Sequence, residues 1–211
     1  MIIVARKGSK RLKNKNFMYL GSKTLVERSI IFAKKLVENK NIILSTDSKK
    51  ILEIGKENEI LVPWLRPKNL SQDSSKSVDV ALHALKWYEK NIKKKKFILL
   101  LQPTTPFRNL IFFKKALSTI IKNKKNNYVS VSPLKNRAQI NKNLKFKNKV
   151  LNQKKNKNYY FNGSMYLIST NEIKKKKSFI TKSTIGMIIK EKKFLLDIDN
   201  RKDLNLAKTY L

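Results

Sequence analysis

Cationic and hydroxyl side chains gather in one short segment near the start of the chain. Residues 5–11 read Ala-Arg-Lys-Gly-Ser-Lys-Arg, and Lys15 and Asn16 follow. Gly8 allows a ligand to approach the backbone closely, Ser9 offers a hydroxyl group, and the surrounding cations suit a triphosphate. The spacing matches neither the Walker A loop nor the G-x-G-x-x-G motif. On these residues alone, a phosphate-binding loop and an ordinary basic turn are equally good interpretations.

Two carboxylates near the end of the chain form the second chemical feature. Asp197 and Asp199 are two residues apart, so on an extended segment both side chains point to the same face. Like charges this close repel each other unless a cation lies between them. Oxygen ligands suit Mg²⁺, which a triphosphate would share, so we predict a metal site at this pair. The alternative is that Asp199 or Asn200 caps the final helix.

Other metal and nucleophile chemistries are limited by composition. The chain has no cysteine and a single histidine, His83, so disulfides, thiolate nucleophiles and multi-histidine zinc sites are excluded. Any metal must be held by hard oxygen ligands. We expect His83 to be a packed, structural residue rather than a catalytic one.

The formal net charge of +35 raises the alternative of a nucleic-acid-binding module. The lysines, however, are spread along the chain among asparagine and isoleucine, residues that share A/T-rich codons, and we expect a solvated surface. A nucleic-acid site requires clustered cations with aromatic platforms. The best such cluster is residues 159–161 (YYF) beside residues 154–157 (KKNK).

Strand-like and helix-like segments alternate along most of the chain, which predicts right-handed βαβ units. The expected strands are residues 1–4, 41–45, 61–65, 97–101, 128–132, 165–168 and 185–189. The expected helices are residues 24–36, 49–58 capped by Ser48, about 74–91 capped by Asp73 or Ser74, 110–122 and 201–210. We predict an α/β fold with a doubly wound, mostly parallel sheet. Residues 1–211 should form one domain, in which the irregular residues 134–158 form a dimerisation arm or a flap.

No apolar run reaches the roughly 18–20 residues that a membrane helix needs. Residues 1–5 are apolar but run directly into Arg6 and Lys7, unlike a secretory signal, whose basic residues precede a longer apolar region. We therefore expect a cytoplasmic protein with no membrane partner.

Six segments in order resemble the acylneuraminate cytidylyltransferase family, the CMP-N-acetylneuraminic acid synthetases. They are residues 4–12 (VARKGSKRL) with 15–16 (KN), 45–48 (STDS), 62–67 (VPWLRP) with the following Leu70, Asp73 and Ser77, 101–108 (LQPTTPFR), 162–166 (NGSMY) and 197–199 (DID). In the first segment, Lys7 stands where the family has a glycine and Lys13 where it has a proline. The arginine that often precedes the NG pair is also absent.

The resemblance implies a Rossmann-like fold of the nucleotide-diphospho-sugar transferase type with a small extension, which usually works as a homodimer. It implies that CTP and Mg²⁺ are used to convert an acidic 2-keto sugar into a CMP-sugar and pyrophosphate. The implied catalytic residues are Arg6, Lys10 and Lys15. The implied nucleotide-binding residues are Ala5, Arg6, Gly8, Ser9, Lys10, Lys15, Asn16, Arg66, Ser75, Ser77 and Gln102. Gln102, Thr104, Asn162 and Tyr166 would bind the sugar, and Asp197 and Asp199 the metal.

Several alternatives remain open from the sequence. The sugar could be N-acetylneuraminate, legionaminic acid, pseudaminic acid or Kdo, and the chain could be a non-catalytic subunit. Arg66 could instead form a surface ion pair, and Gln102 could bond only within its proline-containing turn. Tyr166 could be a core aromatic residue.

Overall fold

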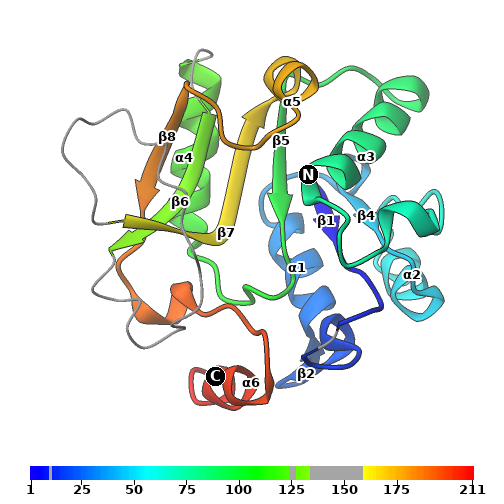
Figure 1. The fold of residues 1–211 in the computed structure, drawn as a ribbon, viewed down its shortest axis with the longest axis vertical. Coiled ribbons are helices and arrows are strands. Elements are labelled where there is room, and N and C mark those ends of the chain that lie inside the picture. Colours follow the sequence, from blue (N-terminus) through cyan, green and yellow to red (C-terminus); the bar gives the residue numbers. More distant parts are fainter. Residues whose placement is uncertain (10, 124–126, 134–158) are drawn as a thin grey trace.

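A six-stranded sheet in the order β4-β1-β5-β7-β6-β8 runs through the centre of the computed structural model (Figure 1). The structure describes residues 1–9, 11–123, 127–133 and 159–211. The strands are β1 (Ile2–Val4), β4 (Ile43–Ser45), β5 (Phe97–Leu101), β6 (Asn127–Pro133), β7 (Tyr159–Ser169) and β8 (Thr184–Ile188). β1 is parallel to β4 and β5, and β6 is parallel to β8, whereas β7 is antiparallel to both of its neighbours. The predicted α/β class with a mostly parallel sheet is confirmed.

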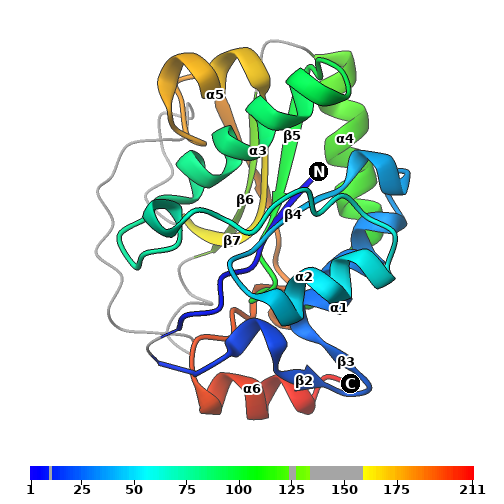
Figure 2. The same cartoon turned by 90° about the vertical axis from the view of Figure 1, so that its right-hand side faces the viewer.

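Helices cover both faces of the sheet (Figure 2). They are α1 (Leu25–Lys34), α2 (Lys49–Glu57), α3 (Ser77–Asn91), α4 (Leu110–Lys122), α5 (Thr170–Lys176) and α6 (Arg201–Lys208). Alternate residues of each strand point to opposite faces. Ile3 and Leu99 therefore pack in the cluster that contains residues of α1, α2 and α4, whereas Ile2 and Ile98 pack with residues of α3 and α5. This two-sided burial explains why the sequence of β5 is wholly apolar.

Local capping explains where several helices begin. Thr24 and Glu27 form a reciprocal capping box on α1, and the Ser48 side chain accepts from the backbone N–H of Ile51 in α2. Asn200 caps α6 by accepting from two backbone N–H groups, so the cap of the final helix is Asn200 rather than Asp199. α4 has the predicted bounds.

The predicted cap of α3 is wrong. The helix begins at Ser77, and its N-cap residue, Lys76, makes no capping bond with its side chain. The expected capping groups have other partners, because Asp73 forms an ion pair with Arg6 and the Ser74 hydroxyl donates to the Gln72 side chain at 3.4 Å. The segment before Ser77 therefore does not extend the helix, and it lines the ligand pocket described below.

A small hairpin of β2 (Tyr19–Leu20) and β3 (Lys23–Thr24) was not predicted, and neither was α5. Leu20 in the hairpin and Leu204 and Ala207 in α6 belong to one buried cluster, which fixes α6 beneath the sheet (Figure 1). Among the described residues, no helix is both long enough and apolar enough to cross a membrane. The predicted arm or flap at 134–158 lies outside the described residues.

Candidate active site

A pocket opens where β1 and β5 end. Loops that follow the carboxyl ends of parallel strands are the usual ligand-binding position in such sheets. The space it encloses, including its open mouth, is about 800 Å³. Ten of the residues predicted for nucleotide or sugar binding line it: Arg6, Gly8, Ser9, Lys15, Asn16, Arg66, Ser75, Ser77, Gln102 and Thr104. Segments that are distant in sequence therefore meet at one site.

The loop after β1 is held by bonds on both sides. The buried Ala5 donates its backbone N–H to the Ser45 carbonyl at 3.0 Å, and the Asn16 amide donates to the Arg6 carbonyl at 2.9 Å. The backbone N–H of Lys7 donates to Asp47 at 2.6 Å. Ala5 and Asn16 thus shape the loop by these bonds. Of the predicted catalytic residues, Lys10 lies outside the described part of the chain.

Arg6 carries its charge into the pocket and pairs there with Asp73. Both side chains are partly exposed, 34% and 42% respectively. The resemblance included Asp73, but the sequence reasoning used it only as a helix cap. Because Asp73 lines the pocket beside a phosphate-binding candidate, a triphosphate would compete with it for Arg6.

Asp199 is joined to the pocket through Lys15. The Lys15 Nζ lies 2.8 Å from Asp199 Oδ1, and Arg11 lies 2.7 Å from Asp199 Oδ2. The Lys15 side chain is only 13% exposed, whereas that of Arg11 is 63% exposed. Asp199, near the end of the chain, is thus joined by ion pairs to Arg11 and Lys15 in the segment that follows β1.

The carboxylate of Asp197 is shielded from solvent. Its Oδ1 atom is buried and has no hydrogen-bond partner in the described structure. Burial raises the pKa of Asp197, a hydrogen bond with Thr104 opposes this shift, and the nearby charge of Asp199 adds to it. Burial also raises the pKa of Tyr166 to about 12, with a smaller contribution from Asp197. Thr104, Tyr166 and Asp197 are therefore neighbours.

The chemistry of this carboxylate pair fits a hard cation such as Mg²⁺. Asp197 offers a buried oxygen that lacks a donor, and Asp199 offers oxygens that currently face cations. Within the described residues, no group of three His, Cys, Asp or Glu side chains could hold a metal. A metal at this pair would therefore need further oxygens from phosphate or water.

Arg66 is buried, with 7% of its surface exposed, so the alternative of a surface ion pair is wrong. Its Nε donates to Ser45 Oγ at 3.1 Å, and its Nη2 donates to the Ser45 carbonyl. Burial lowers the pKa of Arg66 to about 10; the negative charge of Asp47 opposes this shift and the positive charge of Arg6 adds to it. A buried guanidinium fixed at a pocket wall is a preorganised anion or nucleotide contact.

Gln102 has separate roles for its main chain and its side chain. Its carbonyl accepts from Thr105 N–H at 3.1 Å and from Arg108 at 2.6 Å, so the main chain forms the turn. Its side chain lies against Gly163 of β7, where an added Cβ atom would be 3.3 Å from Gln102 Oε1. The buried Arg108 was not predicted as a site residue, although it is one of the scarce arginines.

The structure does not bring Asn162 into this pocket. Its amide donates to Ser132 Oγ at 2.7 Å and accepts from the Ser164 backbone N–H at 3.1 Å, and it also accepts from the Ser130 hydroxyl. Tyr166 does not line the pocket either; it packs 5.3 Å from the Phe179 ring. Sugar contacts for both residues stay predictions.

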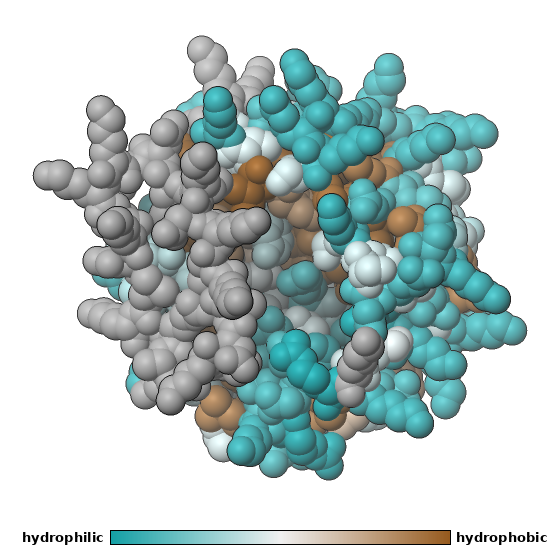
Figure 3. Space-filling view, in the orientation of Figure 1, coloured by the Kyte–Doolittle hydropathy of each residue, from teal (hydrophilic) through white to brown (hydrophobic). Residues whose placement is uncertain are grey.

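The aromatic run at residues 159–161, which suggested nucleic-acid binding, is partly buried in the structure. Tyr160, in the middle of the aromatic run, is buried with 6% exposed surface, so it offers no open platform for a base. The neighbouring lysines at 154–157 lie outside the described residues. Hydrophilic side chains are spread over the face in Figure 3, as expected for a solvated surface.

The sheet places this pocket where α/β folds bind their ligands, and comparison with known proteins gives the family and enzyme class. A family model described as cytidylyltransferase matches residues 1–209, so the chain belongs to the cytidylyltransferase family. The predicted family and enzyme class are confirmed.

Two curated relatives illustrate this membership. The CMP-N,N'-diacetyllegionaminic acid synthase of Legionella pneumophila is 31% identical, over 98% of this chain and 93% of its own length. The N-acylneuraminate cytidylyltransferase of Streptococcus agalactiae is 31% identical over 96% of this chain, which spans 50% of that longer protein.

Solved structures support the fold. A CMP-2-keto-3-deoxy-manno-octonic acid synthetase, solved with CTP bound, superposes with a TM-score of 0.71 over 99% of this chain and 96% of its own. The sequence identity is 12%, so this likeness establishes the fold alone.

Proposed function

We propose that this protein couples CTP to an acidic 2-keto sugar, N-acetylneuraminate or a relative, and forms a CMP-sugar and pyrophosphate. The observation that carries this proposal is the convergence of Arg6, Lys15 and Arg66 on one pocket, where Lys15 is also in contact with Asp199. A tetra-anionic triphosphate complements this concentration of positive charge. The names of the relatives support acidic sugars as the acceptors.

In the proposed reaction, the anomeric hydroxyl of the sugar attacks the α-phosphorus of CTP, the bond to the β-phosphate breaks, and pyrophosphate leaves. Arg6, Lys10 and Lys15 bind the triphosphate and stabilise the charge on the leaving group. In this proposal the phosphates lie beside the backbone of Gly8 and Ser9, where there is room for them, since a side chain at Gly8 would meet no atom within 4 Å. No covalent nucleophile is required.

Asp197 and Asp199 are the residues that would hold Mg²⁺. When bound, the ion neutralises phosphate charge and favours attack at phosphorus. In this scheme Lys15 positions Asp199 through their 2.8 Å contact. Thr104 positions Asp197 through a hydrogen bond.

The nucleoside and the sugar occupy the two sides of Gln102 in this proposal. Arg66, Ser75 and Ser77 contact the nucleoside, and the Gln102 amide, which can donate and accept, contacts hydroxyl groups of ribose or sugar. Thr104, Asn162 and Tyr166 are assigned to the sugar side. For Asn162 this requires its amide to exchange the bonds to Ser132 and Ser164 described above.

The activity is tested by ³¹P NMR of the protein with CTP, Mg²⁺ and one acidic sugar at a time. The panel contains N-acetylneuraminate, N,N'-diacetyllegionaminic acid, pseudaminic acid and Kdo. We expect one sugar to give a phosphodiester signal and an equal amount of pyrophosphate. CTP binding without turnover on the whole panel would contradict catalysis and favour a non-catalytic subunit.

The proposal extends to organisation and location. We propose a single domain over residues 1–211 that works in the cytoplasm as a homodimer, with residues 134–158 as the arm or flap. The formal charge of +35 opposes association at low ionic strength. Analytical ultracentrifugation at physiological salt tests the dimer, and a monomer at micromolar concentration would contradict it.

A further inference from the structure

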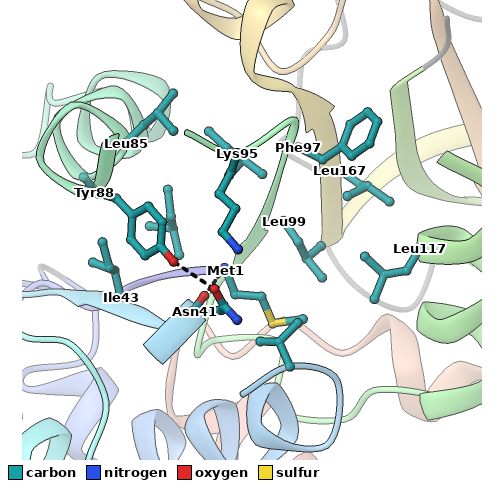
Figure 4. A pocket seen from close by; sticks show the side chains of 14 residues that line it. Met1, Asn41, Ile43, Leu85, Tyr88, Lys95, Phe97, Leu99, Leu117 and Leu167 are labelled. Carbon is teal, nitrogen blue, oxygen red and sulfur yellow. Dashed lines mark hydrogen bonds between the residues drawn. The ribbon is translucent and has the colours of Figure 1, made fainter. Parts of the chain in front are cut away.

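A second pocket lies at the opposite ends of the strands that carry the nucleotide loops. It encloses about 730 Å³, including its mouth, which is within the size range of small-molecule sites. Its walls come from both faces of the sheet: Leu85 and Tyr88 belong to α3, Leu117 to α4, and Phe97 and Leu99 to β5 (Figure 4). β5 has five residues at about 3.3 Å each, so the two pockets are separated by roughly the length of that strand.

The lining is almost entirely apolar, with one side-chain cation. Lys95 extends into the pocket, and its Nζ lies between Tyr88 and Leu99 (Figure 4). The Nζ is 5.9 Å from the centre of the Tyr88 ring. No lining residue is Asp or Glu, and Lys95 has no ion pair with any residue that the structure describes.

The other polar side chains of the pocket are already paired with each other. The Tyr88 hydroxyl donates to Asn41 Oδ1 at 2.8 Å, which Figure 4 shows as a dashed line. Lys95 differs from them because its half-buried ammonium group has no carboxylate at ion-pair distance among the described residues. Burial lowers the pKa of Lys95, and the nearby charges of Lys93 and Lys40 add to this shift, whereas the charge of Glu38 opposes it. The net lowering indicates surroundings that favour an added anion.

We propose that this pocket is a binding site for a small amphipathic carboxylate, whose acid group pairs with Lys95 and whose hydrocarbon chain lies among Leu85, Leu99, Leu117 and Leu167. An apolar cavity alone would accept any hydrocarbon. The Lys95 ammonium group selects an anion over an alcohol or a cation, and no Asp or Glu lines the pocket to compete with that anion. The site is separate from the nucleotide pocket and does not depend on the proposed reaction.

Isothermal titration calorimetry with octanoate tests the site, with octanol and octyltrimethylammonium as ligands of similar chain length and different charge. The protein is saturated with CTP, so the nucleotide pocket is occupied. We expect octanoate to bind about tenfold more tightly than octanol, from one charge-assisted contact. In Lys95→Met, which keeps the apolar stem, that preference should fall to about one.

Matched variants separate this site from general attraction to a cationic protein. Lys94→Met removes the neighbouring exposed lysine and should leave octanoate binding unchanged. Val37→Trp fills the pocket from its wall and should weaken both octanoate and octanol. Thermal unfolding confirms that each variant is folded.

Three results would overturn the proposal: equal affinity for octanoate and octanol in the unmodified protein, equal losses in Lys94→Met and Lys95→Met, or binding of octanoate only when CTP is left out. The first would mean that Lys95 selects nothing. The second would mean that binding follows overall charge, and the third would place the ligand in the nucleotide pocket.

Discussion

Replacing Lys15 by Met gives the sharpest test of the charged site. Lys15 lines the nucleotide pocket, its side chain is only 13% exposed, and its Nζ contacts Asp199 at 2.8 Å. The methionine keeps most of the apolar stem and removes the charge. Because the ammonium group is largely shielded from water, its contact with a phosphate is worth about 2–3 kcal/mol in the transition state. At about 1.4 kcal/mol per factor of ten, kcat/KM should fall roughly 30- to 150-fold.

The matched control is Arg11→Met. Arg11 contacts the same carboxylate, Asp199, at 2.7 Å, but its side chain is 63% exposed. An exposed ion pair contributes about 0–1 kcal/mol, so kcat/KM should fall no more than about fivefold. The two variants therefore share one partner and differ in burial and in access to the pocket.

The assay is continuous pyrophosphate release with the sugar that supports turnover, at two salt concentrations. Circular dichroism and thermal unfolding establish that both variants are folded. A loss in Lys15→Met no larger than that in Arg11→Met would refute the assignment of Lys15 to the triphosphate. A large and equal loss of kcat/KM in both variants would mean that the two cations act by positioning Asp199 rather than by contact with a phosphate.

Three further predictions concern the surrounding structure. Gly163→Ala should destabilise the fold by about 1 kcal/mol or more in urea unfolding, because the φ angle of Gly163 is +77°. The variant should also raise the KM for sugar, because the added Cβ would lie 3.3 Å from Gln102 Oε1. Unchanged values would contradict this. Arg66→Lys should weaken CTP binding about tenfold by calorimetry, since lysine lacks the fork that holds Ser45; full affinity would count against the contact. Burial and nearby cations lower the pKa of His83, so the unfolded chain binds the proton first as the pH drops below about 6.5, and the folded state loses stability. In His83→Gln, the melting temperature should therefore fall less steeply between pH 7.5 and pH 5.5 than in the unmodified protein. An identical slope would refute this.

Long, regular elements were predictable from the sequence, whereas short ones were not. α4 has its predicted bounds because Asn109 caps a strongly amphipathic segment. The β2–β3 hairpin was missed since strands of two residues carry no periodicity. β7 was predicted at residues 165–168 but spans Tyr159–Ser169, because the polar side chain of Asn162 is satisfied inside the sheet by Ser130 and Ser132.

The pocket could be predicted from the rule that ligands bind beyond the carboxyl ends of parallel strands, together with the family resemblance. Individual contacts could not. The Lys15–Asp199 contact joins residues 184 positions apart, and no local pattern encodes such a pair. The burial of Arg66 likewise depends on the neighbouring strand, whose Ser45 carbonyl accepts from the guanidinium. The start of α3 was misplaced because an ion pair with Arg6 engages the expected cap, Asp73.

The central claim is that the opening loop and the late aspartates form one triphosphate site. A crystal structure with CTP and Mg²⁺ bound measures this directly. We expect the phosphates to contact Arg6 and Lys15, the base to lie beside Arg66 and Ser77, and the metal to contact Asp197 and Asp199. Density for CTP outside the pocket, or phosphates that contact neither Arg6 nor Lys15, would contradict the account.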